Sequence, residues 1–132
     1  MTITPLYAGL LAIWFLMLSA KVVGGRRSGK INLGDGGDRH MQSMIRGHAN
    51  FSEYVPLILI LMLCLEVGGA TPVWLLHLMG MSLLVARILH GIALSYLPKF
   101  FLGRFIGTLA TFILLLVAGL LCVWRGIAAL IV

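Results

Sequence analysis

The sequence predicts an all-α fold, namely an integral membrane bundle of four helices. Of its 132 residues, 61% are hydrophobic and only 11% are charged, whereas a soluble domain keeps about a quarter of its residues charged. The mean hydropathy is +1.07. Four long apolar runs are separated by short polar or turn-forming segments. Each run reaches the length of about 20 residues that a helix needs to cross a bilayer.

The four helices are expected over about residues 3–23, 42–67, 73–96 and 103–130, within a single domain of residues 1–132. The first run shows no small-residue cleavage pattern, so we expect it to remain as a helix rather than to be removed as a signal peptide. The segment Gly34-Asp35-Gly36-Gly37-Asp38 indicates a polar connector, since glycine and aspartate favour turns. Residues 68–72 and Pro98 separate the remaining helices.

The charge distribution argues against nucleic acid as a partner and for a fixed orientation in the membrane. The net charge is +6, but five basic residues lie in or beside the first connector: Arg26, Arg27, Lys30, Arg39 and Arg46. Lys99 and Arg104 lie at the third connector, and the second has no basic residue. The positive-inside rule therefore predicts that connectors one and three are cytoplasmic and that both termini lie outside.

No metal site is expected. Cys64 and Cys122 each lie within an apolar run, and neither belongs to a CxxC motif or a Cys/His cluster. Such cysteines usually pack as small hydrophobic side chains.

Polar residues of three helices are predicted to meet at one level of the bundle. Arg46, Asn50 and Glu53 have the spacing i, i+4, i+7 and share one face of the second helix. Arg87 and Arg104 approach the same level from the third and fourth helices. A structural Glu53–Arg87 ion pair is the alternative, but it does not require the other polar residues. An arginine-rich pocket suits a ligand that bears carboxylates, and Glu53 would then receive its ammonium group.

No side chain near this pocket is a placed nucleophile. Cys64 lies about 16 Å beyond Glu53 along the helix. The nucleophile would have to arrive with the ligand, and a thiol is suitable because neighbouring cations stabilise the thiolate.

Two motifs resemble those of the MAPEG family, the membrane-associated proteins of eicosanoid and glutathione metabolism. The stretch from Arg46 to Pro56 reads R-x-x-x-N-x-x-E-Y-x-P, and Ala86-Arg87-Ile88-Leu89-His90 resembles the third-helix motif of the family. The Gly-Asp-Gly-Gly-Asp connector is similar to that of the small bacterial inner-membrane branch. The resemblance covers essentially the whole chain.

The resemblance implies a homotrimer that binds glutathione as cosubstrate between protomers, near the cytoplasmic side of a bacterial inner membrane. Four roles follow for residues of this chain. Glutathione would be held by Arg46, Asn50, Glu53 and Tyr54, with support from Arg87 and His90. Arg104 would be catalytic by stabilising the thiolate, and Lys21 and His48 would reach in from the adjacent subunit. The alternative for Lys21 is snorkelling to the interface, and for His48 packing at the helix start.

Leu94 departs from the family pattern, because eicosanoid-forming members carry a tyrosine at that position, and Tyr96 is expected to point elsewhere. The implied function is a glutathione-dependent transferase or peroxidase acting on lipophilic electrophiles or lipid hydroperoxides. Two alternatives remain, a small four-helix multidrug transporter and a non-catalytic membrane scaffold. Such transporters carry an essential carboxylate in the first helix, and the first run here has none.

Overall fold

Four long helices form an antiparallel bundle in the computed structural model, which describes residues 2–97 and 99–131. They are α1 (Ile3–Ser28), α2 (Arg39–Val67), α3 (Val73–Ser95) and α4 (Phe101–Ile131). No strand occurs among the described residues. Each helix is long and apolar enough to cross a membrane. The all-α membrane bundle predicted from the sequence is therefore confirmed.

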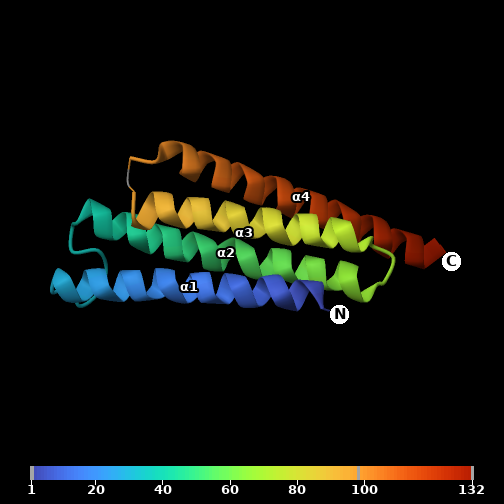
Figure 1. Ribbon diagram of the computed structural model, residues 1–132, viewed down its shortest axis with the longest axis horizontal. Helices are drawn as coiled ribbons and strands as arrows, with labels where there is room; N and C mark the ends of the chain where they lie inside the picture. The colour runs from blue at the N-terminus through green and yellow to red at the C-terminus, as the bar shows by residue number, and fades with distance from the viewer. Residues whose placement is uncertain (1, 98, 132) are drawn as a thin grey trace.

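The helices pack in a simple order (Figure 1). Helix α1 contacts α2 and α3, and α4 covers α3 and α2 from the other side, without contacting α1 in the described part of the chain. Both chain termini lie at the same end of the bundle. The opposite end therefore holds the first and third connectors, together with the starts of α2 and α4 and the end of α3.

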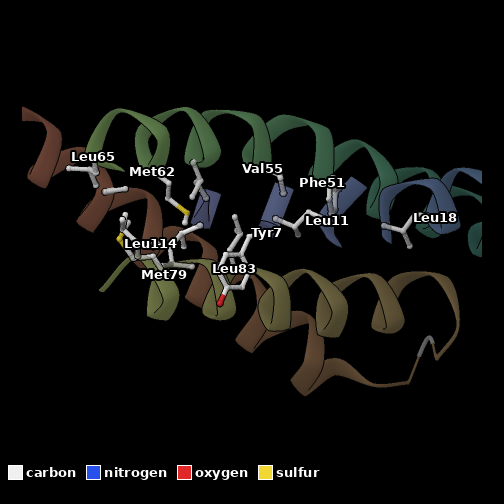
Figure 2. Close-up of a cluster of buried hydrophobic side chains, with 14 residues drawn as sticks. Tyr7, Leu11, Leu18, Phe51, Val55, Met62, Leu65, Met79, Leu83 and Leu114 are labelled. Carbon is white, nitrogen blue, oxygen red and sulfur yellow. The ribbon is translucent and has the colours of Figure 1, made fainter. Parts of the chain in front are cut away.

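The core is a continuous cluster of hydrophobic side chains, mostly aliphatic, between α1, α2 and α3, with a contribution from α4 (Figure 2). Leu11, Ile58, Met62 and Leu83 are almost completely buried. Many large apolar side chains on the outer surface are exposed, as expected where lipid rather than water is the solvent.

Helix α1 extends beyond residue 23, where the sequence predicted its end. Gly24 and Gly25 are helical although glycine is a weak helix former. The physical reason is packing: a Cβ at Gly25 would lie 2.7 Å from Cε of Met44, so glycine lets α2 approach closely here. Helix α2 begins at Arg39 rather than near residue 42, because the carboxylate of Asp38 accepts a hydrogen bond from His40 N at 2.8 Å.

A second glycine contact brings α3 and α4 together beside the polar residues of the bundle. A Cβ at Gly107 would lie 2.6 Å from the carbonyl oxygen of Ala86 and 2.8 Å from Cβ of His90. Only glycine allows this approach, which sets the distance between the two helices near His90.

At the end of the bundle that holds the termini, Glu66 of α2 fastens the start of α1. Its Oε1 accepts hydrogen bonds from the backbone N–H groups of Thr2, at 2.6 Å, and Ile3, at 2.9 Å. Its Oε2 accepts one from Thr4 N at 2.8 Å. A carboxylate that satisfies the free N–H groups of a helix N-terminus also interacts favourably with the helix dipole.

Candidate functional site

A cavity of about 380 Å³ opens at the connector end of the bundle, between α2, α3 and α4. We call it the arginine cup, because three guanidinium groups line it and no carboxylate does. Its lining consists of Arg39, Gln42, Ser43, Arg46 and Asn50 of α2, His90 and Leu94 of α3, and Arg104 and Thr108 of α4. The lining residues of each helix include i, i+4 pairs, so each helix presents one face to the cavity.

Arg87 lies next to the cup with a side chain that is only 1% exposed. Its Nη2 donates to Oδ1 of Asn50 at 2.9 Å, and its Nη1 donates to Oγ1 of Thr111 at 3.3 Å. Its guanidinium carbon also lies 5.7 Å from the centre of the Phe51 ring. Arg87 thereby connects three helices and holds the amide of Asn50, a cup residue, in one orientation.

The tautomer of His90 follows from its contact with Arg87. Nη2 of Arg87 lies 3.4 Å from Nδ1 of His90. A guanidinium group can only donate hydrogen bonds, so Nδ1 is the acceptor and a neutral His90 carries its proton on Nε2.

Glu53 forms its ion pair with Arg46, at 3.6 Å between Oε1 and Nη1. The alternative of a Glu53–Arg87 ion pair is therefore wrong, since Arg87 contacts Asn50 instead. The physical reason is depth in the bundle: the side chain of Glu53 is 48% exposed, whereas Arg87 is buried between the helices.

Tyr54 does not line the cup. Its ring contacts the ring of Phe112 on α4, with 5.4 Å between ring centres, so within one protomer it packs α2 against α4.

Neither hydroxyl group in the cup is arranged as a nucleophile. Oγ of Ser43 donates to the carbonyl oxygen of Leu94 at 2.9 Å, and Oγ1 of Thr108 donates to that of Arg104 at 2.9 Å. No cysteine belongs to the lining. The arrangement is suited to binding an anion and stabilising negative charge, while a reacting nucleophile would have to come from the ligand.

Comparison with known proteins places this architecture in a family. The family model described as "MAPEG family" matches residues 4–124. The chain belongs to the MAPEG family. It is 36% identical over 122 residues to the protein named "Inner membrane protein YecN" of Escherichia coli K12, covering 92% of this chain and 91% of that one. The protein of the same name from Escherichia coli O6:H1 matches to the same extent. No solved structure shows a significant match.

The MAPEG resemblance inferred from the two motifs is thus confirmed, and the motif residues divide into three groups in the structure. Arg46, Asn50, His90 and Arg104 meet in the cup. Arg87 lies beside it and reaches it through Asn50. The third group, Lys21, His48, Glu53 and Tyr54, does not line the cup of its own protomer.

Lys21 and His48 lie on the α1 side of the bundle. Nε2 of His48 is 2.9 Å from Oγ of Ser19, and its ring stacks on Phe15 at 4.5 Å between ring centres. Nζ of Lys21 lies 4.9 Å from the centre of the Tyr96 ring. Within one protomer, these two side chains therefore have partners of their own.

Tyr96 points away from the cup, as the sequence predicted. Its ring stacks on Trp14 with 6.4 Å between centres. Leu94, by contrast, lines the cup and is 8% exposed.

Sequence reasoning missed the other cup residues, namely Arg39, Gln42, Ser43 and Thr108, and the Arg87 partner Thr111. Helical spacing was the available signal. Arg39 and Ser43 precede Arg46 and Asn50 by one or two turns on the same face of α2, and Thr108 and Thr111 follow Arg104 at i+4 and i+7 on α4.

Proposed function

We propose that this MAPEG protein binds glutathione in the arginine cup and activates its thiol as a thiolate. The observation that carries the proposal is a cavity lined by three guanidinium groups, two amides and one imidazole, with no carboxylate in its lining. Glutathione carries two carboxylates, an ammonium group and a thiol. Arginine is the side chain best suited to binding carboxylates, because its planar fork offers two parallel donors.

Each predicted contact has a physical role in this proposal. Arg46 and Asn50 bind a glutathione carboxylate, while Arg87, which is buried, orients Asn50 through its hydrogen bond. Glu53 receives the ammonium group, and Tyr54 helps to hold the same ligand. His90 supports glutathione from α3 through Nε2–H.

Arg104 stabilises the thiolate. A cation beside a thiol favours the deprotonated form, so more of the bound glutathione is nucleophilic at neutral pH. In a transferase reaction the sulfur forms a bond to an electrophilic carbon and the leaving group departs. In a peroxidase reaction two glutathione molecules reduce a hydroperoxide to an alcohol and water, and are themselves oxidised to the disulfide. The lipophilic cosubstrate arrives from the bilayer in both cases.

The exposure of Glu53 supports a neighbouring subunit at this face, as in the proposed homotrimer. Glu53 lies about 21 Å from the start of α2, which is about half of the helix length at 1.5 Å per residue. Its side chain is 48% exposed in the single protomer. A charged side chain facing lipid at this depth is unfavourable by several kcal/mol. A neighbouring protomer that covers this face removes the cost, and Lys21 and His48 of that neighbour then approach the ligand.

The proposed location is a bacterial inner membrane, supported by the name "Inner membrane protein YecN" that both relatives carry. Connectors one and three are proposed to face the cytoplasm, which would place the opening of the cup on that side.

Glutathione binding by the detergent-purified protein tests the proposal. Millimolar glutathione should raise the melting temperature, since a ligand that binds only the folded state stabilises it by mass action. Arg46→Ala should reduce this shift, and Arg125→Ala, at the other end of the bundle, should leave it unchanged. Turnover with a generic aromatic electrophile in detergent would exclude a transporter, which needs a gradient. No shift in the wild type would refute glutathione as the ligand, and a shift without turnover would favour the scaffold.

A further inference from the structure

A second cavity, of about 460 Å³, lies outside the arginine cup at the end of α1. We call it the basic pocket, and its lining consists of Val23, Arg26, Arg27, Lys30, Ile31 and Asn32. It is shallow and open at the protein surface. The pocket shares no lining residue with the cup.

The backbone holds the three cations of this pocket in a defined arrangement. The chain reverses at Lys30, whose φ is 51°, a left-handed conformation. The reversal is fixed by hydrogen bonds from Ile31 N to the carbonyl of Arg26 at 2.9 Å, and from Lys30 N to that of Arg27 at 3.3 Å. Lys30 is thus brought back toward the two arginines instead of continuing away from them.

No carboxylate neutralises these cations among the described residues. The same connector contains two aspartates, and both are engaged with the backbone. Oδ1 of Asp35 accepts a hydrogen bond from Gly37 N at 2.9 Å, and Oδ1 of Asp38 accepts one from His40 N at 2.8 Å. Nε of Arg26 is shielded from solvent and has no hydrogen-bond partner in the described structure. A guanidinium group in this condition favours an anion in the pocket, because an unpaired buried donor is costly.

The position of the pocket relative to the membrane narrows the choice of anion. Helix α1 has 26 residues and is about 39 Å long at 1.5 Å per residue, longer than the hydrocarbon core of about 30 Å. Its last turns therefore lie at the level of the lipid headgroups. Val23, which is 57% exposed, adds an apolar side chain on the membrane side of the cations.

We propose that the basic pocket is a binding site for an anionic phospholipid, with the headgroup phosphate held by Arg26, Arg27 and Lys30 and the acyl chains directed along Val23 toward the bilayer. Basic clusters at the end of a membrane helix attract anionic lipids in this way. Because the pocket is separate from the cup, the proposal does not rest on glutathione binding or on catalysis.

The test compares two exposed lysines on the two connectors at this end of the bundle. The full-length protein is mixed in detergent with phosphatidylglycerol or phosphatidylcholine, and lipid retention is measured by native mass spectrometry. Wild type should retain phosphatidylglycerol preferentially. Lys30→Gln should weaken that retention about fivefold, the effect of about one surface cation. Lys99→Gln, which removes the same charge from the third connector, should leave it unchanged.

Arg26→Gln should weaken retention at least as much as Lys30→Gln. Equal retention by both lysine variants would overturn the site, and so would equal binding of the two lipids by the wild type. Inorganic phosphate provides the second arm. If it competes with phosphatidylglycerol at equal concentration, the occupant is a free anion and the lipid assignment is wrong. A loss of thermal stability in Lys30→Gln with unchanged lipid retention would assign the cations to the helix dipole alone, which also overturns the proposal.

Discussion

At the end of the bundle that holds the termini, one carboxylate accepts hydrogen bonds from three backbone N–H groups at the start of α1. At the opposite end, three arginine side chains surround an open cavity with no carboxylate in its lining. Both ends contain charged side chains close to the membrane boundary. Glu66 is engaged by the protein's own backbone and therefore contributes to stability. The arginines of the cup keep donors available, and this availability is what a ligand site requires.

The largest expected effect concerns the orientation of the two ends in the membrane, because each end lies either in the cytoplasm or outside it. We predict that the end with the cup faces the cytoplasm and that both termini lie outside, because the first connector carries four basic residues (Arg26, Arg27, Lys30 and Arg39) and the second carries none. A reporter enzyme that is active only outside the cytoplasm should be active when fused to the C-terminus. If a reporter that works only in the cytoplasm were active at the C-terminus instead, the termini would lie in the cytoplasm and the cup would face outside.

Substitutions at the two ends of α4 should separate catalysis from stability. At a pH below the pKa of the bound thiol, Arg104→Ala should lower turnover about tenfold. The reason is that loss of one charge partner raises this pKa by about one unit, equivalent to about 1.4 kcal/mol, and so leaves about one tenth as much thiolate. Glutathione affinity should change much less. Arg104→Lys should retain part of the activity, since it keeps the charge but not the planar fork.

Arg125→Ala is the matched control at the other end of α4, and it should keep normal turnover. The thiolate of bound glutathione can be followed by ultraviolet absorbance. An unchanged thiol pKa in Arg104→Ala, with normal turnover per folded molecule, would limit Arg104 to anchoring α4, and Arg87 would be the next candidate.

Two glutamates on the same helix sharpen the comparison further. Glu66→Gln should lower the free energy of unfolding by about 1–3 kcal/mol, because it weakens charge-assisted hydrogen bonds to the backbone, and should leave glutathione affinity unchanged. Glu53→Gln removes an exposed ion pair worth about 0–1 kcal/mol in one protomer, and should weaken glutathione binding. Thermal unfolding and binding titrations measure both quantities. If the two variants behaved alike, the proposed division of roles between the two ends would be incorrect.

Substitution of Leu94 should give the smallest expected change in glutathione binding. Leu94→Tyr places a hydroxyl in the wall of the cup, and one added hydrogen bond of about 0.5–1.5 kcal/mol should tighten glutathione binding about two- to tenfold. Leu94→Phe is the control, because it adds the ring without the hydroxyl. Isothermal titration of both variants should give a lower Kd for Leu94→Tyr than for Leu94→Phe. Equal values would mean that the ligand does not approach this wall of the cup.

The number, order and apolar character of the helices are determined by the sequence alone. Hydropathy and turn residues are local signals, and they identify four segments able to cross a membrane without any knowledge of packing. Helical periodicity likewise predicted that Arg46 and Asn50 share a face of α2, and both line the cup. The boundary of α1 was less predictable, because glycine is a weak helix former and the close approach of Met44 of α2 to the helical Gly25 is a tertiary contact.

The partners of the charged side chains were decided by the tertiary structure. Arg87 contacts Asn50 rather than Glu53, and Thr111 completes the contact, because the rotation of each helix about its axis selects which face meets its neighbour. Close packing at Gly107 helps to set that arrangement between α3 and α4. The bond from Glu66 to Thr2 joins residues 64 positions apart, and no periodic pattern in a single helix reports such a separation. Local composition identifies the segments, whereas their pairing depends on contacts that form only when the bundle assembles.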